Sequence, residues 1–402
     1  MTVQPYRIEV PIPVLDDLRD RLTKTRFIGG MADTGWDRGT DNDYLKNLCD
    51  YWRRDFNWRA QERYLNSFKH FRAEVDGIGI HFIHERGRGP NPIPLLLIHG
   101  WPDSFARFLK VIPMLTDPPA RGASQQPSFD VIVPSLPGFG FSDRPQKQGL
   151  TFKLGDLFHK LMVEELNYPR FAVQGGDWGA TVAEHMARSH ASSLIGIHLT
   201  DVPFFHMFQK PGDLSGAEEK YLKKMQQFQQ TEGAYALIQS TRPQTLACGL
   251  NDSPAGLAAW MIEKFRSWSD CDGDLESRFT RDEILTHIMI YWATQTIDSS
   301  FAPYYDMANA GPMRWIAETV KTWVGSSAVP AGFALFPKDL VTPPRTWAER
   351  FFNVQRWAEM PRGGHFAAME EPELFAGDLR ATFEPLWSAA ARSDVPVPSA
   401  AY

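Results

Sequence analysis

Short apolar runs recur along the middle and the end of the chain and predict buried β-strands. They lie at residues 93–98, 129–134, 171–174, 194–199, 332–336 and 354–357. Runs without alternating polar residues are typical of strands buried on both faces, as in a parallel sheet covered by helices. Upstream, residues 71–84 alternate between apolar and polar side chains around an Asp-Gly turn, which predicts a β-hairpin.

Helical periodicity marks the first part of the chain. Leu15, Leu18 and Leu22 recur at helical spacing between acidic and basic residues, and residues 44–56 repeat the pattern. This segment carries no candidate chemistry, so we interpret it as a structural extension packed on a larger domain. Because the later apolar runs are separated by helical stretches, the whole chain is predicted to have an α/β fold with a mostly parallel central sheet.

The apolar runs stop between residues 203 and 325 and then resume. That insert has a helical pattern and is rich in Phe and Trp. We predict that it forms a lid over the carboxyl ends of the strands, where open α/β sheets place their sites. The expected organisation is an N-terminal extension (1–85), a core (86–202 and 326–390), the lid (203–325) and a tail (391–402).

Composition narrows the class of protein. The 402 residues include 42 Lys and Arg against 48 Asp and Glu, and this net charge of −6 argues against a nucleic-acid binder. Three cysteines, Cys49, Cys248 and Cys271, lack CxxC spacing and predict neither a disulfide framework nor a structural zinc site. The first residues show neither a signal peptide nor a membrane anchor, so we expect a soluble, cytoplasmic protein.

One Gly-rich turn is the first candidate for chemistry. The sequence Gly-Gly-Asp-Trp-Gly at 175–179 follows a predicted strand and precedes a predicted helix at 180–190. Small residues on both sides of the central position are what a sharp strand-to-helix turn requires, and in α/β-hydrolases this turn exposes a nucleophile. Here the central residue is Asp177, whose carboxylate can attack a saturated, electrophilic carbon and form an ester. An Asp in such a turn is also a common helix cap.

Two further turns supply partners for Asp177. His-Gly-Trp-Pro at 99–102 follows an earlier strand, and in this architecture that loop and the residue after the nucleophile provide an oxyanion hole. The candidate amides are those of Trp101 and Trp178, although 99–102 could also be an ordinary strand-ending turn. Gly-Gly-His at 363–365 follows the last strand, and Asp339 follows the strand before it. The order Asp177, Asp339, His365 is the order of nucleophile, acid and base in α/β-hydrolases.

The chain resembles the epoxide hydrolase family of α/β-hydrolases, in the branch with an extra N-terminal domain that includes the microsomal-type enzymes. The segments that carry this resemblance are HGWP at 99–102, GGDWG at 175–179, DSPAGLAAWMIEKF at 252–265, RGGHFAAMEEPE at 362–373 and YLKNLCDYWRRDFNWRAQERYLN at 44–66. Since no N-terminal anchor is evident, the chain is most similar to soluble microbial members.

The resemblance implies two lid tyrosines that hydrogen-bond the epoxide oxygen. By position in the family pattern these are Tyr235 and Tyr304, with Tyr305 one residue away in register. Tyr221 and Tyr291 compete for this role, but their helical spacing fits core packing better. The implied reaction converts an apolar epoxide into a vicinal diol through an ester on Asp177, which water activated by His365 then cleaves.

Two other functions remain open from the sequence. A haloalkane dehalogenase also uses an Asp nucleophile and could hold a halide with Trp101 and Trp178, but the lid tyrosines and the extension argue against it. A catalytically silent ligand-binding protein would not need the full Asp–Asp–His set. We expect no metal, no organic cofactor, no nucleic acid and no membrane partner. The substrate and the oligomeric state are left open, with a homodimer among the options.

Overall fold

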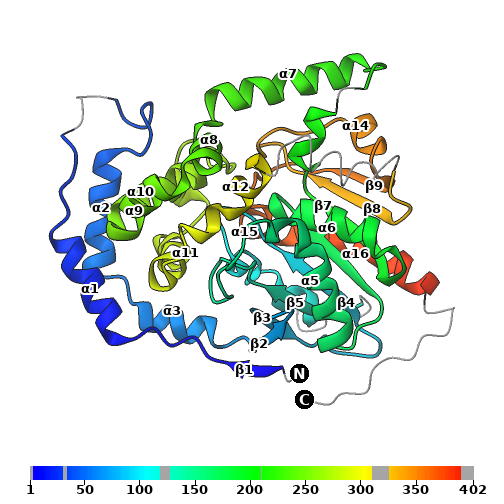
Figure 1. Cartoon of the computed structure of the whole chain (residues 1–402), viewed down its shortest axis with the longest axis horizontal. Helices are drawn as coiled ribbons and strands as arrows, with labels where there is room; N and C mark the ends of the chain where they lie inside the picture. The colour runs from blue at the N-terminus through cyan, green and yellow to red at the C-terminus, as the bar shows by residue number, and fades with distance from the viewer. Residues whose placement is uncertain (1–2, 30–33, 118–126, 210, 310–325, 391–402) are drawn as a thin grey trace.

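The protein is built on a single twisted sheet of nine strands (Figure 1). The computed structural model describes residues 3–29, 34–117, 127–209, 211–309 and 326–390. The strand order is β1-β2-β3-β5-β4-β6-β7-β8-β9. The strands are β1 (Gln4–Tyr6), β2 (His70–Val75), β3 (Ile78–Glu85), β4 (Ile93–Ile98), β5 (Phe129–Pro134), β6 (Phe171–Gly175), β7 (Leu194–Leu199), β8 (Pro330–Leu335) and β9 (Asn353–Glu359).

The predicted strands are confirmed, and the sheet is mostly parallel. The strands β5, β4, β6, β7, β8 and β9 pair in parallel, while β1, β2 and β3 pair antiparallel at one edge. Every residue of β4, β5, β6 and β7 is buried, as their continuous apolar runs indicated. Strand β1 was not predicted, because three residues with one proline carry no readable alternation.

Helices cover both faces of the sheet. On one face lie α5 (Leu154–Lys160) and α6 (Trp178–Ser189), and on the other lies α16 (Pro372–Ala390) (Figure 1). The close fit of α16 is visible at Gly196 of β7, where an added Cβ would lie 2.7 Å from Leu386. The described part of the core also contains the shorter helices α4 (Ile112–Thr116), α14 (Arg345–Glu349) and α15 (Ala367–Glu370).

The insert forms a helical lid. Its helices are α7 (Gly216–Thr231), α8 (Ala234–Thr241), α9 (Pro243–Asp252), α10 (Pro254–Ser267), α11 (Arg281–Thr294) and α12 (Ala302–Asn309). Between 203 and 309 no strand is present at the residues that the structure describes, in agreement with the prediction. The remainder of the predicted lid, 310–325, and the predicted tail, 391–402, lie outside the described residues.

The N-terminal extension holds the lid from its outer side. Its helices α1 (Ile12–Thr23), α2 (Asn42–Arg54) and α3 (Trp58–Leu65) run beside α9, α10 and α11 (Figure 1). Asp282 at the start of α11 accepts hydrogen bonds from the Tyr51 hydroxyl at 2.8 Å and from Gln61 at 3.1 Å. Arg21 of α1 pairs with Asp252 at 2.6 Å. The extension therefore contacts both ends of the lid segment 252–282.

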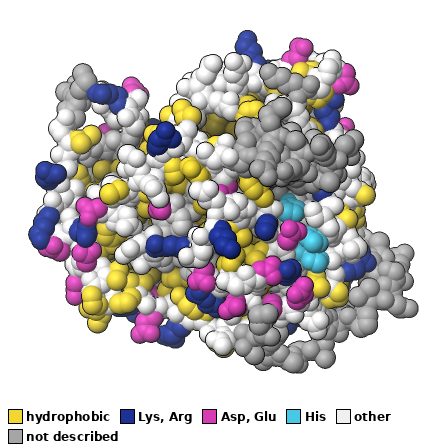
Figure 2. All heavy atoms as spheres, in the orientation of Figure 1, with side chains coloured by type: hydrophobic (Ala, Val, Ile, Leu, Met, Phe, Trp, Pro, Cys, Tyr) yellow, Lys and Arg dark blue, Asp and Glu magenta, His cyan; other side chains and the backbone are white. Residues whose placement is uncertain are grey.

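The surface mixes both signs of charge. On the face seen in Figure 2, acidic and basic side chains lie interspersed with apolar ones, in keeping with the small net charge of −6. Within the described ranges, no helix is both long enough and apolar enough to cross a membrane.

Candidate active site

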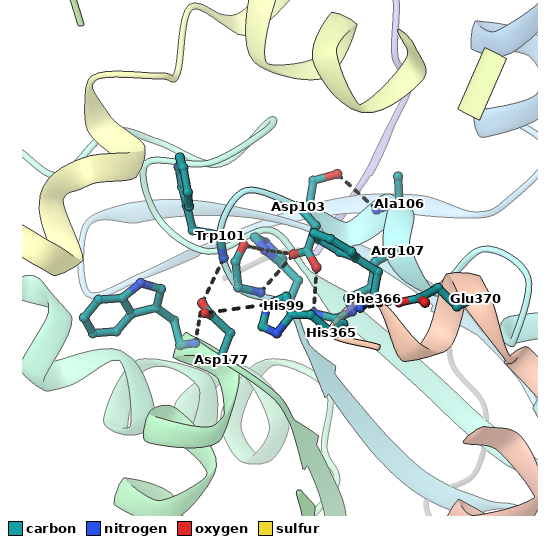
Figure 3. A network of polar contacts seen from close by, with 12 residues as sticks. His99, Trp101, Asp103, Ala106, Arg107, Asp177, His365, Phe366 and Glu370 are labelled. Carbon is teal, nitrogen blue, oxygen red and sulfur yellow. Dashed lines mark hydrogen bonds and ion pairs between the residues drawn. The ribbon is translucent and has the colours of Figure 1, made fainter. Parts of the chain in front are cut away.

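Asp177 lies at the tip of a sharp turn between β6 and α6. It is the N-cap residue of α6, with φ 56° and ψ −127°, a strained conformation for a residue with a side chain. Such backbone strain costs on the order of 1–3 kcal/mol and persists only where surrounding contacts enforce it. The turn directs the carboxylate toward the loops that follow β4 and β9 (Figure 3).

Three glycines make this turn sterically feasible. A Cβ on Gly179 would lie 2.2 Å from the carbonyl oxygen of Ile98, and one on Gly175 would lie 2.1 Å from that of Gly179. A Cβ on Gly100 would lie 2.3 Å from Oδ1 of Asp177. The small residues that the sequence places around Asp177 are thus required by close backbone contacts.

Two backbone amides hold one oxygen of Asp177. Oδ1 accepts hydrogen bonds from the N–H groups of Trp101 at 3.0 Å and Trp178 at 2.7 Å (Figure 3). These are the two amides that the sequence predicted for an oxyanion hole. The other oxygen, Oδ2, faces His365, with 3.8 Å between it and Nε2. One carboxylate oxygen is therefore fixed by donors while the other remains available for bond formation.

His365 and Asp339 form a hydrogen-bonded pair. Nδ1 of His365 lies 2.8 Å from Oδ1 of Asp339, which also accepts the N–H of Leu340 at 2.7 Å. Both residues sit in loops at the carboxyl ends of the strands, Asp339 after β8 and His365 after β9. The imidazole is buried with its Nε2 directed at Asp177, which is the arrangement that a general base for an attacking water requires.

Electrostatics favour a protonated imidazole at His365 in the resting enzyme. Burial alone would lower the pKa of His365, but the charge and hydrogen bond of Asp339 and the charge of Asp177 outweigh it and raise the pKa to about 9. Burial raises the pKa of Asp177, and the charge of His365 and the two amides oppose that rise. A third carboxyl, Asp201 after β7, accepts the N–H of Asp177 at 3.2 Å. Its burial and the charges of Asp339 and Asp177 raise the pKa of Asp201 well above the usual range.

Tyr235 and Tyr304 face Asp177 from the lid. The Tyr235 ring stacks on the indole of Trp101, with centroids 5.2 Å apart and planes within 7°. The Tyr304 ring meets the indole of Trp178 edge-on at 5.0 Å, and the two tyrosine rings lie 5.9 Å apart. Burial, then the charge of Asp177, raises the pKa of Tyr235, so its hydroxyl keeps its proton at neutral pH.

Comparison with known proteins assigns the family. Residues 3–108 match the family described as epoxide hydrolase N terminus, and residues 93–232 match the alpha/beta hydrolase fold family. Pig epoxide hydrolase 1 is 39% identical over 94% of this chain and 88% of its own length. The chain belongs to the epoxide hydrolase family. It is thus an enzyme of this family, as its motifs predicted.

Solved structures of family members superpose over nearly the whole chain. Juvenile hormone epoxide hydrolase from the silkworm Bombyx mori gives a TM-score of 0.86 at 28% identity, covering 97% of this chain and 96% of that one. Aspergillus niger epoxide hydrolase gives 0.81 at 28% identity, covering 96% and 97%. Family membership favours epoxide hydrolysis over the dehalogenase and the silent binding protein that the sequence left open.

The three alternative tyrosines of this epoxide hydrolase family member, Tyr221, Tyr291 and Tyr305, have different surroundings from Tyr235 and Tyr304. Tyr221 is buried against Trp347, with ring centroids 5.8 Å apart, and Tyr291 donates its hydroxyl to the carbonyl oxygen of Asp103 at 2.8 Å. Tyr305, the neighbour of Tyr304, is only half-buried. Among these positions, Tyr304 is the one whose ring contacts Trp101, Trp178 and Tyr235.

Sequence reasoning missed several polar residues around the site. Asp201 was not singled out, and neither were Asp103, Arg107 and Glu370, which hydrogen-bond the loops that carry Trp101 and His365 (Figure 3). Burial raises the pKa of Glu370 to about 7 although it accepts backbone N–H groups on both sides of His365. An acidic and a basic residue four positions apart, directly after the HGWP motif, could have indicated the ion pair of Asp103 and Arg107.

Metal ligands were not expected. Across the described part of the chain, no group of three or more His, Cys, Asp or Glu side chains is placed to hold a metal ion. The three cysteines are unpaired, with Cys49 and Cys271 buried and Cys248 exposed.

Proposed function

We propose that the protein hydrolyses apolar epoxides to vicinal diols in two steps through an alkyl ester on Asp177. The observation that carries this proposal is the placement of the Asp177 carboxylate. Two amides bind its Oδ1, the His365–Asp339 pair faces its Oδ2, and two lid phenols lie opposite. The aromatic surroundings, which include Trp268 and Phe301 next to Trp101, support an apolar substrate.

In the first step Oδ2 of Asp177 attacks an epoxide carbon. The carbon–oxygen bond of the ring breaks, and the electron pair stays on the epoxide oxygen. Because an alkoxide is a poor leaving group, it needs a proton donor in a site from which water is excluded. Tyr235 and Tyr304 supply hydrogen bonds and a proton from the opposite side.

In the second step water cleaves the ester. Nε2 of His365 takes a proton from water, and the water oxygen attacks the Cγ carbon of Asp177. The negative charge that develops on Oδ1 falls where the amides of Trp101 and Trp178 already donate. When the intermediate collapses, the bond between Cγ and the diol oxygen breaks, and that oxygen, which Asp177 contributed, takes the proton held by His365. The diol leaves, the water oxygen remains in the new carboxyl group, and this group returns its proton to His365.

Ester formation also prepares His365 for its role as a base. The negative charge of Asp177 is one of the interactions that raise the pKa of His365 to about 9. Alkylation converts the carboxylate into a neutral ester and removes that interaction. The pKa of His365 therefore falls in the intermediate, and the imidazole releases its proton, which restores the tyrosine that protonated the alkoxide. The neutral imidazole is then available to activate water.

A single turnover in oxygen-18 water tests the covalent route. With enzyme in excess over styrene oxide, the label should enter the side chain of Asp177 and be absent from the first diol formed. Mass spectrometry of the peptide that contains Asp177 and of the diol measures both. Label in the diol but not in the peptide would mean that water attacks the epoxide directly, and the nucleophile assignment would then be wrong.

Removing the lid hydroxyls should slow ring opening. Losing a donor that acts mainly in the transition state typically costs about 2.7–4 kcal/mol, or ~10²–10³ in rate. We expect Tyr235→Phe and Tyr304→Phe each to slow alkylation by up to this factor. The double variant should lose almost all alkylation activity. Ester hydrolysis should be unchanged, because it depends on His365 and the two amides. Rapid-quench measurement of each step separates the two effects.

Tyr221→Phe provides the matched control for these variants. Tyr221 is an equally buried lid tyrosine that packs on Trp347. Besides burial, the charges that raise its pKa are those of Asp201 and Asp339, whereas the charge of Asp177 acts on Tyr235 and Tyr304. The Tyr221→Phe enzyme should form the ester on Asp177 at the parent rate. If both site variants also alkylate at the parent rate, Tyr235 and Tyr304 are not the donors, and Tyr305→Phe tests the neighbouring register.

A further inference from the structure

Asp103 and Arg107 form a buried ion pair next to the active site. Nη1 of Arg107 lies 2.6 Å from Oδ2 of Asp103, and their side chains are only 2% and 0% exposed. Asp103 directly follows the HGWP loop, and Arg107 lies within the short 3₁₀ helix (Phe105–Phe108) that comes next. Removing two charges from water is costly, and an apolar pair of similar volume is often as stable. Stability alone therefore does not account for this pair.

The remaining atoms of the pair reach two loops of the site. Oδ1 of Asp103 accepts the N–H of Gly100 at 3.0 Å, one residue before the Trp101 amide. Nη2 of Arg107 donates to the carbonyl oxygen of His365 at 2.7 Å (Figure 3). The lid joins the same cluster, because the hydroxyl of Tyr291 donates to the carbonyl oxygen of Asp103.

We propose that Asp103 and Arg107 are positioning residues for the ester-hydrolysis step. Through one ion pair they fix the Trp101 amide, which binds the oxyanion, relative to the His365 imidazole, which activates water. This inference rests on the proposed two-step function. It assigns the pair to the second step because only that step requires a base and develops negative charge on Oδ1. In the first step the Trp101 amide only orients Oδ1, which the N–H of Trp178 also holds.

Backbone hydrogen bonds hold the residues around His365, while its carbonyl oxygen accepts from Arg107. The N–H of His365 donates to Trp268 at 2.8 Å, and Glu370 accepts the amides of Gly364 and Phe366 at 3.0 and 2.9 Å. These bonds hold the chain on both sides of the base. The guanidinium contributes the link between this loop and the oxyanion loop.

Arg107 also acts on His365 through its charge. The charged or titratable groups that interact with this imidazole are Asp339, Asp177, Arg107, Asp103, Asp201 and Glu370. The positive charge of Arg107 lowers the pKa of His365, against the effects of Asp339 and Asp177. Once Asp177 is a neutral ester, Arg107 helps to keep the imidazole in its neutral, basic form.

Arg107→Lys separates position from charge. Lysine keeps the positive charge but lacks the planar fork that donates to Asp103 and His365 together. We expect hydrolysis to slow by about 10- to 100-fold, the loss that a misplaced catalytic group typically causes. Alkylation should stay close to the parent rate, so alkyl-enzyme should accumulate in rapid-quench mass spectra. The apparent pKa of hydrolysis should be unchanged.

Arg107→Gln removes the charge and should also move the pH profile. Without the guanidinium the pKa of His365 in the ester rises, so a larger share of the imidazole is protonated at neutral pH. Hydrolysis requires the neutral imidazole. The pH at which the hydrolysis rate rises should therefore be higher in this variant than in the parent enzyme. A role confined to folding would change the amount of active enzyme but not this profile.

A second buried pair supplies the matched control. Arg188 and Glu184 on α6 are also four residues apart, 2.7 Å from each other and buried, and Arg188 donates to the carbonyl oxygen of Phe351 at 3.1 Å. Arg188→Lys and Arg188→Gln should affect stability without changing the ratio of hydrolysis to alkylation or the pH profile.

The outcomes distinguish this inference from the proposed function. An Arg107→Lys enzyme with the parent ratio of hydrolysis to alkylation would overturn the positioning role. If that variant does not fold, Asp103→Asn tests the same link, because asparagine still accepts the Gly100 N–H but no longer fixes the guanidinium. It should accumulate alkyl-enzyme, and a parent ratio would again overturn the role. Absence of alkyl-enzyme from every variant and from His365→Gln would instead contradict the two-step function itself.

Discussion

Replacing Asp177 with alanine should abolish epoxide hydrolysis. The variant loses the only carboxylate that the Trp101 and Trp178 amides bind within the described structure, and with it the atom that forms the ester. Removing a nucleophile from a catalytic triad reduces turnover by roughly 10⁴- to 10⁶-fold. Diol formation measures the loss, and intact-mass spectra should show no adduct at any time after mixing with an epoxide.

Asp130→Ala is the control for this loss. Asp130 is also a buried carboxylate, but it lies near the amino end of β5, whereas Asp177 follows the carboxyl end of β6. Asp130 accepts hydrogen bonds from Arg86 and from the N–H of Gly87 at 2.9 and 2.8 Å. Its loss should lower stability while the folded fraction remains active. Measurable turnover or an adduct in the Asp177→Ala enzyme would show that another group attacks the epoxide.

Replacing His365 with glutamine should trap the intermediate. Asp177 remains in place, so the variant should still open one epoxide per active site. No base then activates water, and hydrolysis should fall by roughly 10⁴-fold or more, as when a member of a triad is lost. Intact-mass spectra should show a stable increase equal to the mass of the epoxide, located by digestion on the peptide that contains Asp177.

His198→Gln tests whether this effect is specific. His198 on β7 is also buried and lies 3.1 Å from a carboxylate oxygen of Asp378, so it mimics the His365–Asp339 pair away from the site. The control should turn over without accumulating adduct. If His365→Gln instead hydrolyses its ester at an ordinary rate, the base is a different residue.

Much of the fold could be read from local patterns, because buried parallel strands leave continuous apolar runs. The same reasoning located the turn around Asp177, since Gly175 and Gly179 are small for steric reasons that any such turn shares. The chain order of Asp177, Asp339 and His365 then followed from the order of the strands. These features depend on neighbouring residues or on topology, which a sequence displays directly.

Contacts between distant loops could not be predicted in this way. Arg107 bonds the carbonyl oxygen of His365 across 258 residues, and nothing in either motif indicates a partner. The edge strand β1 exists only because β2 offers its free edge to residues 4–6. The position of Tyr304 relative to Tyr305 depends on the rotation of a two-turn helix, α12, which a one-residue shift in its start would change.

The hydrogen bonds between the N-terminal extension and the lid have a consequence for engineering. Tyr51, Gln61 and Arg21 bond side chains of the lid, and the Thr40 hydroxyl donates to the carbonyl oxygen of Ala259 at 2.6 Å. A grafted lid that lacks Asp252 and Asp282 would leave Arg21, Tyr51 and Gln61 without their side-chain acceptors. Chimeras should therefore exchange the extension and the lid as one module, so that the partners of Asp252 and Asp282 move with them.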